Sequence, residues 1–446
     1  MNKHLSKYLF YYPVTLARGE HVSKYLKQYE ASQWWSQNDI ANYQLNRVKE
    51  LFVYAANNCP YYKKSLTEKG FDVASIHDLS SISQLPEISK TDIVKYRSTI
   101  TSSKKSLNIS SKTTGGSTGQ AVTILKNANA LARERAATWR SYRWAGVEVG
   151  DVQARFWGVP LTSKSRYISK VVDFISNRSR LSAFSITEVE LDKYYEKLVK
   201  INPAYLYGYV SMITVFAEHI KNKGYPALPS LRSVITTSEV LDETSRTTIE
   251  KAFNVKVYNE YGCGEVGSIA HECEYGNMHI MAENMIVEID KADSPDGTSG
   301  EIIVTDLFNY AMPLIRYRIG DFATLSSEKC SCGRGLPILK HVHGRAYDVL
   351  IDPDGRKYHP EALMYVFEEL KSKQSGIKQF QVIQKAVNKL QINLVLEGGH
   401  APSIELQLTN RIRETVHPDF IFDFSYMKTL EREKSGKMRV IKSELK

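Results

Sequence analysis

The sequence predicts an α/β protein with a large, multi-layered N-terminal part and a small α+β unit at its C-terminal end. Two observations indicate this class. From about residue 110 to about residue 325, short apolar strands alternate with helical segments, whereas after Gly344 the order becomes helix, strand, strand, helix, strand. The chain has 446 residues, a length typical of two or three domains. We place a large domain at residues 1–345 and a small one at 346–446.

The first hundred residues are expected to be mainly helical. Their apolar residues recur at helical spacing, for example at Leu45, Val48, Leu51, Phe52 and Ala55. Pro60 should end this helix, because proline lacks an N–H group and disfavours a helical residue before it. Ser89-Lys90-Thr91-Asp92 predicts the start of another helix.

The middle of the chain contains apolar strands expected at Val152–Trp157, Leu231–Thr236, Val255–Tyr258 and Ile302–Asp306. In such layered folds, ligands bind at the carboxyl ends of the strands. In the tail we expect an antiparallel sheet packed with helices. Its elements are a helix at Pro360–Leu370, strands at Gln379–Gln384 and Leu390–Glu397, a helix at Ser403–Thr415 and a strand at Phe422–Met427.

Composition excludes several classes of protein. No stretch of eighteen apolar residues exists, so we expect no membrane span. The N-terminal apolar patch is too short and aromatic for a secretory signal, and five cysteines do not make a disulfide scaffold, so we expect a cytoplasmic protein. The net charge of +10 is scattered, which favours an anionic nucleotide substrate over nucleic acid and leaves weak membrane-surface contact open. The oligomeric state is left open.

A Gly/Ser/Thr segment at Thr113–Gly119 has the composition of a phosphate-binding loop. Glycines let backbone N–H groups approach phosphate oxygens, and hydroxyls donate further hydrogen bonds. It is not a Walker A loop, because Gln120-Ala121 replaces the Lys-Ser/Thr pair. Taken alone, the segment is equally compatible with a flexible polar turn.

Further motifs follow this loop in a fixed order: Tyr261–Glu265, Met312–Asp321, Gly344–Asp348 and Ser435–Lys437. Together they resemble the adenylate-forming (acyl-CoA synthetase-like) superfamily. With the stretch from Leu45 to Lys90, they are similar to its phenylacetate-CoA ligase branch, which includes CapK-like proteins of capsular polysaccharide biosynthesis. The resemblance covers about residues 45–446.

The resemblance implies an ATP-dependent, AMP-forming ligase that activates a carboxylic acid as its acyl-adenylate. The acyl group would then pass to CoA or to an amine or hydroxyl acceptor such as a glycan precursor. Residues 346–446 would form a mobile lid domain that carries the catalytic lysine. The alternatives are a nucleotidyltransferase or kinase that uses the same loop, and a non-catalytic protein of polysaccharide assembly.

The resemblance also implies roles for single residues. Lys437 would bridge the carboxylate and the α-phosphate, Glu265 would hold Mg²⁺, and Asp348 would be the hinge. A larger set would bind ATP or AMP: Thr114, Gly115, Gly116, Ser117, Thr118, Gly119, Ser238, Glu239, Tyr261, Gly262, Asp321 and Arg345. The chemistry suits these residue types, because Mg²⁺ and a lysine offset the repulsion between a carboxylate and a phosphate in the transition state.

Cys330-Ser331-Cys332, together with Cys273 and His279 upstream, supplies three thiolates and an imidazole. This set suits tetrahedral Zn²⁺, and we expect a structural zinc that pins residues 262–280 to residues 325–335. His271 is an alternative nitrogen ligand. The other interpretation is a group of reduced, partly buried thiols.

Two aromatic segments are expected to line the acyl pocket. The candidates are Trp157, Tyr207, Gly208 and Tyr209. Aromatic walls with a small residue between them suit a flat or medium-sized apolar acid. Ordinary core aromatics are the alternative interpretation, and the sequence does not give the size of the pocket.

Overall fold

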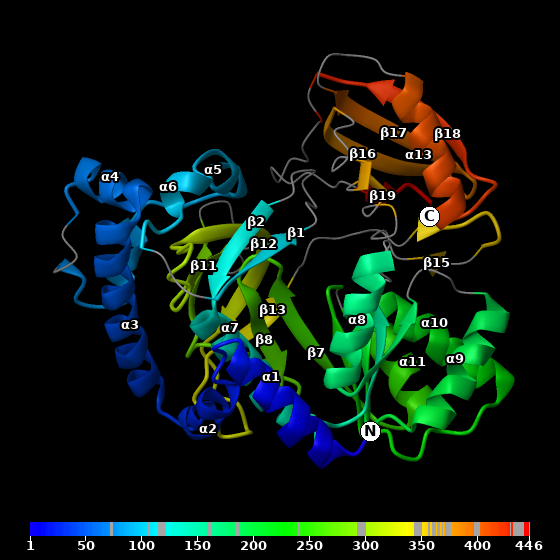
Figure 1. Ribbon diagram of the computed structural model, residues 1–446, viewed down its shortest axis with the longest axis horizontal. Helices are drawn as coiled ribbons and strands as arrows, with labels where there is room; N and C mark the ends of the chain where they lie inside the picture. The colour runs from blue at the N-terminus through cyan, green and yellow to red at the C-terminus, as the bar shows by residue number, and fades with distance from the viewer. Residues whose placement is uncertain are drawn as a thin grey trace.

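The computed structural model describes the chain with the exception of residues 72–74, 105–107, 115–121, 158–162, 183–186, 240, 242, 292–299, 343–349, 356, 359–362, 364–365, 368, 371–375, 397–401, 429, 431–440 and 446. Figure 1 shows a wide lower body and a smaller unit at the upper right, coloured orange and red. Within the described part of the chain, no helix combines the length and the hydropathy that crossing a bilayer requires.

The first hundred residues are helical, as their apolar spacing predicts. The helices are η1 (Leu5–Tyr11), α1 (Tyr12–Ala17), α2 (Val22–Ser32), α3 (Gln37–Asn58), α4 (Pro60–Glu68), η3 (Ser80–Gln84), α5 (Lys90–Lys95) and α6 (Arg97–Ile100). The hydroxyl of Ser89 accepts a hydrogen bond from the N–H of Asp92, and the carboxylate of Asp92 accepts one from the N–H of Ser89, which confirms the predicted start of α5. Pro60 follows the end of α3 as predicted but also starts α4, because proline is tolerated in a first turn.

Eleven strands of the described residues form one sheet in the order β10-β11-β12-β13-β9-β8-β7-β6-β5-β3-β4. The half from β4 to β7 is parallel, and the half from β7 to β10 is antiparallel. The strands are β3 (Gln153–Trp157), β4 (Arg178–Ser182), β5 (Tyr205–Tyr209), β6 (Ser233–Thr237), β7 (Lys256–Cys263), β8 (Gly267–Glu272), β9 (Met278–Ile280), β10 (Met285–Asp290), β11 (Gly300–Asp306), β12 (Tyr317–Ser326) and β13 (Ile338–Val342). β3, β6, β7 and β11 confirm the four predicted strands.

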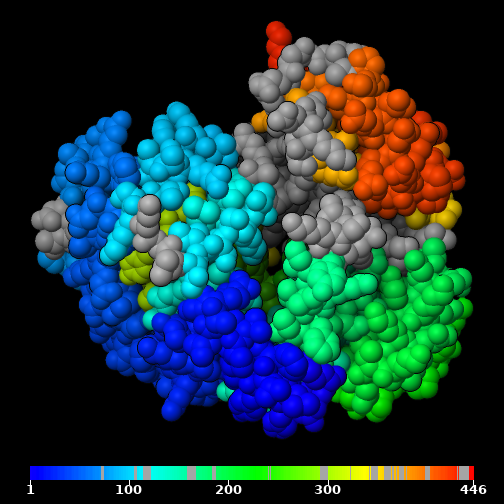
Figure 2. Space-filling view, in the orientation of Figure 1, coloured from blue at the N-terminus to red at the C-terminus, as the bar shows by residue number. Residues whose placement is uncertain are grey.

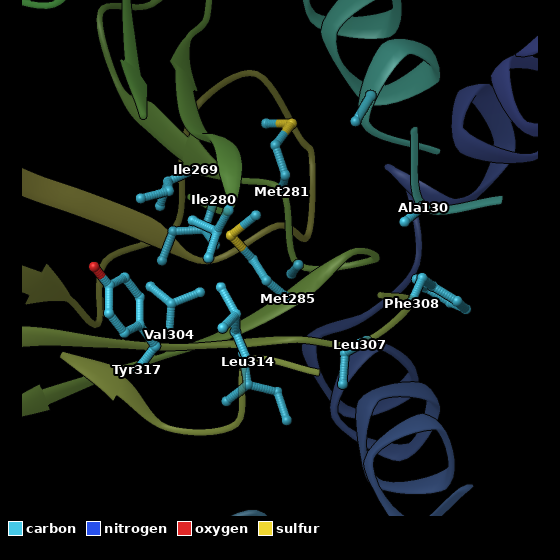
Figure 3. Close-up of a cluster of buried hydrophobic side chains, with 14 of the residues drawn as sticks. Ala130, Ile269, Ile280, Met281, Met285, Val304, Leu307, Phe308, Leu314 and Tyr317 are labelled. Carbon is cyan, nitrogen blue, oxygen red and sulfur yellow. The ribbon is translucent and has the colours of Figure 1, made fainter. Parts of the chain in front are cut away.

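Helices cover the sheet and enclose the two larger of the three apolar clusters that the described residues form around it. They are α7 (Ala128–Trp144), α8 (Ser163–Ile175), α9 (Glu188–Ile201), α10 (Val210–Lys223) and α11 (Glu243–Phe253). One core joins the N-terminal helices to the antiparallel half of the sheet, and the other joins the parallel half to α9, α10 and α11. Figure 3 shows part of the first core, in which Ile280, Met285 and Val304 lie packed together.

A two-stranded hairpin carries the predicted phosphate loop. β1 (Ile109–Thr114) and β2 (Val122–Asn127) are antiparallel, and Thr114 pairs with Val122. Residues 115–121 connect them and lie outside the described residues. Lys126 in β2 donates a hydrogen bond to the carbonyl oxygen of Val266 over 2.8 Å. The hairpin is therefore tied to the turn that follows Glu265.

The small C-terminal unit is an α+β structure with a core of its own. Its elements are β14 (Leu350–Ile351), β15 (Lys357–Tyr358), β16 (Ile377–Ala386), β17 (Lys389–Leu396), α13 (Pro402–Thr415), β18 (Ile421–Tyr426) and β19 (Ile441–Ser443). The expectation of an antiparallel sheet was wrong: in the four-stranded sheet of the described residues, β16 and β17 are antiparallel to each other, whereas β18 and β19 run parallel to their neighbours. α13 crosses between β17 and β18, and a crossover of this kind returns the chain in the same direction. The predicted boundary at residue 345 stays a prediction.

Candidate active site

Tyr261 and Asp321, which belong to two different predicted motifs, are hydrogen-bonded to each other. The phenol of Tyr261 in β7 donates to Oδ2 of Asp321 in β12 over 2.9 Å. β7 and β12 are not neighbours in the sheet, so tertiary folding rather than strand pairing brings the side chains together. Asp321 is buried. The residues that the family resemblance assigns to adenine and ribose are therefore adjacent.

Glu265, the predicted Mg²⁺ ligand, is buried in the turn between β7 and β8. Its Oε1 atom lies 3.6 Å from Nζ of Lys90, and both side chains are largely removed from solvent. Lys90 marked the start of α5 and the end of the stretch that carries the family resemblance, but the sequence did not single it out as a candidate site residue. A signal was available, because a lysine in the first turn of a helix opposes the helix dipole and so needs another reason to be there.

The segment before α5 is fixed to the strand that carries Asp321. The N–H of Ile88 donates to the carbonyl of Arg316 over 3.1 Å, and the N–H of Arg318 donates to the carbonyl of Ile88 over 3.0 Å. Glu87 forms ion pairs with both arginines. Arg318, part of the Met312–Asp321 motif, therefore has a structural partner, and its contacts hold α5 in position relative to β12.

Ser238 and Glu239 follow directly after β6. Ser238 adopts a left-handed conformation with φ of +69°, which is uncommon for serine and turns the chain sharply. Glu239 accepts hydrogen bonds from the backbone N–H and the hydroxyl of Ser211, over 2.6 and 2.9 Å, at the start of α10. The carboxylate thus stabilises the N-terminus of that helix. Contact between this segment and adenine stays a prediction.

The predicted acyl-pocket residues form one aromatic cluster. Trp157 stacks on Tyr209 with ring centroids 4.5 Å apart, and on Tyr207 with centroids 5.8 Å apart. The rings come from the parallel strands β3 and β5. Gly208 permits the close packing, because a Cβ atom there would lie 2.6 Å from the carbonyl oxygen of Phe156. These contacts show that the predicted acyl-pocket residues lie together. Their role in binding an acid stays a prediction.

Polar groups that the sequence analysis missed lie against this cluster. The guanidinium of Arg155 lies over the rings of Trp157 and Tyr207, at 4.2 and 4.8 Å from their centroids. Tyr142 in α7 donates a hydrogen bond to Glu260 over 2.8 Å, and burial raises the pKa of Glu260 to about 6. The aromatic wall therefore has both a cation and a titratable carboxyl group beside it.

Three cysteines and one histidine meet as predicted for zinc. The ligand atoms of Cys273, His279, Cys330 and Cys332 lie within 4.8 Å of one another. The sulfurs of Cys273 and Cys330 are 3.6 Å apart, and Nε2 of His279 is 3.3 Å from the sulfur of Cys332. Two sulfurs bound to one tetrahedral Zn²⁺ at ~2.3 Å would be ~3.8 Å apart, so the spacing fits the ion.

The surroundings of this cluster also suit a metal. Nδ1 of His279 contacts the carbonyl of Leu336 over 3.0 Å, which leaves Nε2 toward the sulfurs. Burial lowers the pKa of His279 to about 4, so the imidazole is neutral, as a ligand must be. Backbone N–H groups point at the sulfurs of Cys330 and Cys332. The donor set therefore fits Zn²⁺.

The alternative ligand His271 is not part of this cluster. It is buried beside Ser268, with which it forms a hydrogen bond, and its ring contacts that of Tyr142. Burial lowers the pKa of His271 to about 3. The sequence left both histidines open as zinc ligands, and the structure places His279 in the cysteine cluster.

Several predicted site residues lie outside the described residues, and their placement is untested: Gly115, Gly116, Ser117, Thr118, Gly119, Arg345, Asp348 and Lys437. Thr114 ends β1 at the edge of the loop. Gly262 lies in β7, where a Cβ atom would come within 2.4 Å of the carbonyl oxygen of Gly267. Glycine is thus required there by strand packing alone.

Comparison with known proteins gives consistent matches. A family model described as the CapK C-terminal domain matches residues 350–444. Protein CapK of Staphylococcus aureus is 25% identical over 95% of this chain and 94% of its own length. Phenylacetate-coenzyme A ligase of Thermus thermophilus is 25% identical over 69% of this chain and 71% of its own length.

Solved structures show the same fold. A 2-hydroxyisobutyryl-CoA ligase in complex with 2-HIB-AMP and CoA matches with a TM-score of 0.59 over 91% of this chain and 90% of that chain, at 17% identity. The same ligase in its postadenylation state matches with a TM-score of 0.55. Both matches cover the large part and the small C-terminal unit together, which confirms the predicted fold class.

Proposed function

Because the chain belongs to the adenylate-forming superfamily, in its phenylacetate-CoA ligase and CapK-like branch, we propose that it is an ATP-dependent, AMP-forming carboxylic acid ligase. The observation that carries the proposal is the contact between Tyr261 and Asp321, which joins two nucleotide motifs that lie 60 residues apart. A buried carboxylate, Glu265, and a buried ammonium, Lys90, stand as a pair in the segments beside them.

The proposed mechanism assigns each group one task. Tyr261 would stack on adenine, Asp321 would accept hydrogen bonds from ribose, and Gly115–Gly119 would embrace the β- and γ-phosphates. Glu265 would hold Mg²⁺, which neutralises phosphate charge when it is bound. Lys437 brings an ammonium group to the point where a carboxylate oxygen attacks the α-phosphorus and pyrophosphate leaves. A lid that carries this lysine can withdraw it before the acceptor enters.

The acid and the acceptor belong to the proposal as well. The cluster of Trp157, Tyr207 and Tyr209 would contact an aryl or medium-sized acid. Two of the similar proteins are a phenylacetate-CoA ligase and a 2-hydroxyisobutyryl-CoA ligase, which favours CoA as the acceptor. The resemblance to CapK-like proteins suggests the alternative acceptor, an amine or hydroxyl on a glycan precursor. We assign Zn²⁺ at Cys273, His279, Cys330 and Cys332 a structural role, and we place the enzyme in the cytoplasm, where ATP is supplied.

Exchange of labelled pyrophosphate into ATP tests the proposal. The protein is incubated with Mg²⁺, ATP and a panel of aryl, hydroxy, fatty and amino acids, one at a time. We expect exchange that depends on the acid. Formation of ADP would indicate a kinase, exchange without any carboxylate would indicate a nucleotidyltransferase, and no exchange with any acid would favour a non-catalytic protein. With the active acid, CoA and amino sugars are then compared as acceptors.

A further inference from the structure

The N-terminal helical segment presents its apolar side to solvent. η1 and α1 run without a break from Leu5 to Ala17. The strongly exposed large side chains on it are apolar: Leu5, Tyr8, Leu9 and Leu16. The buried side chains are Ser6, Tyr11 and Thr15. A surface helix of a globular protein normally has the opposite arrangement, with its apolar stripe toward the core.

α8 is turned outward in the same way. Among its described residues, the exposed apolar side chains are Tyr167, Ile168, Val171, Val172 and Phe174, beside the exposed Lys170, and Tyr167 reaches 71% exposure. Its buried side includes Asp173, which forms ion pairs with Arg178 and Arg180. Single apolar residues scattered over a protein surface are common and need no explanation. Two helices that both turn their apolar side chains to solvent do need one.

The two helices lie against each other. The rings of Phe10 and Phe174 meet edge to face at 5.7 Å, and the hydroxyl of Ser6 donates to the carbonyl of Ile175 over 3.4 Å. Figure 2 shows the blue N-terminal helix and the green α8 side by side on one face of the molecule. We call the exposed apolar side chains of the two helical segments the outward apolar face: Leu5, Tyr8, Leu9, Leu16, Tyr167, Ile168, Val171, Val172 and Phe174. A contiguous apolar surface of this kind marks an interaction site.

We propose that the outward apolar face docks on an anionic lipid surface. Residues 1–19 contain Lys3, Lys7 and Arg18 and no acidic residue, and these cations form ion pairs with Glu148, Asp151 and Glu20 outside the segment. Residues 163–182 contain five lysines and arginines, and their only acid is the buried, paired Asp173. Apolar and tyrosine side chains bordered by cations, without an exposed carboxylate in either segment, fit the headgroup region of an anionic bilayer.

Charge argues against a second copy of the chain as the occupant. A two-fold interface brings the same patch of both copies together. Lys3 and Lys7 are paired with Glu148, and Arg18 is paired with Glu20, so the excess of positive charge lies on residues 163–182, where Lys170 is exposed. Face-to-face contact would therefore bring like charges together with few carboxylates to neutralise them. A lipid surface supplies the missing anions. The docking surface does not depend on the ligase activity proposed above.

Co-sedimentation of the full chain with vesicles tests this inference. We expect binding to vesicles of phosphatidylglycerol and phosphatidylcholine, weaker binding at high salt, and little binding to phosphatidylcholine alone. The double variant Leu9→Gln/Ile168→Gln should lower the partition coefficient by about tenfold or more, because two apolar side chains no longer enter the lipid. The matched control is Val189→Gln/Leu406→Gln, which changes two residues that are each 62% exposed elsewhere.

Thermal unfolding midpoints of the variants should equal that of the wild type, since all four positions are exposed. Absence of binding to the phosphatidylglycerol vesicles would overturn the inference. Equal loss of binding in the control variant would do the same. A wild-type dimer in sedimentation velocity that Leu9→Gln/Ile168→Gln dissociates, without vesicle binding, would show that the face joins two copies of the chain.

Discussion

The phenol of Tyr261 donates a hydrogen bond to the carboxylate of Asp321 over 2.9 Å, although β7 and β12 are not neighbours in the sheet. This contact sets the orientation of the carboxylate that we assign to ribose. Asp321→Asn replaces an acceptor-only group with one that also donates. We expect the kcat/KM for ATP in pyrophosphate exchange to fall by about 10²-fold, by analogy with other lost charge-assisted contacts.

Tyr261→Phe keeps the ring and removes the hydrogen bond, so we expect a smaller effect of about tenfold, mainly on the KM for ATP. Tyr258→Phe, on the same strand, is the matched control and should leave the KM unchanged. An Asp321→Asn enzyme with the wild-type KM for ATP would remove the ribose assignment.

Lys90 lies 3.6 Å from Glu265, so its ammonium group stands beside the proposed metal ligand. Lys90→Met should lower the exchange rate by about 10²-fold, because a cation is lost where phosphate charge is stabilised. Lys95→Met removes an exposed lysine from the same helix and should have no effect. Equal activity of the two variants would show that Lys90 serves only the fold.

The cluster of Cys273, His279, Cys330 and Cys332 should contain one zinc ion per chain. Cys330→Ser should abolish zinc retention and lower the free energy of unfolding by several kcal/mol, because metal binding stabilises only the folded state. Cys59→Ser changes a buried cysteine outside the cluster and should retain the metal. Elemental analysis and thermal unfolding measure both effects. Purified wild-type protein without zinc, and with unchanged stability after treatment with a chelator, would contradict the assignment.

Burial raises the pKa of Glu260 from its ordinary value to about 6. The pKa of Glu260 is higher in the folded protein than in the unfolded chain. The contribution of Glu260 to the free energy of unfolding is therefore fully present below the unfolded pKa and is lost as the pH rises through 6. Glu260→Gln should remove this loss. The stability of the wild type relative to the variant should therefore fall by about 2 kcal/mol at most between pH 4.5 and pH 7. Parallel stability profiles for the two proteins would show that the pKa is not raised.

Local signals in the sequence predicted much of the fold and part of the site. The capping residues Ser89 and Asp92 locate α5, since that interaction spans three residues. The residue types of Cys273, His279, Cys330 and Cys332 indicated the metal cluster, because three thiolates and an imidazole suit tetrahedral Zn²⁺. The directions of the strands in the C-terminal sheet could not be predicted from the sequence. Alternation of apolar residues shows which side chains face the core, but not whether neighbouring strands run parallel or antiparallel.

Contacts between segments that lie far apart in the chain could not be predicted from the sequence. Tyr142 and Glu260 are 118 residues apart, and no local pattern pairs them. Lys90 meets Glu265 only because Glu87 and Ile88 fasten its segment to β12. The outward apolar face was equally hidden, since an apolar stripe on a helix ordinarily predicts burial. The assignments of the phosphate loop, Arg345, Asp348 and Lys437 stay predictions.

Lys437→Ala tests the central claim most directly, with Lys434→Ala as the matched control. With the acid identified by the panel, wild-type protein and control should exchange labelled pyrophosphate into ATP at similar rates. The Lys437→Ala protein should lose this exchange by about 10²-fold or more while it still binds ATP and unfolds at the same temperature. Unimpaired carboxylate-dependent exchange in Lys437→Ala would contradict the account.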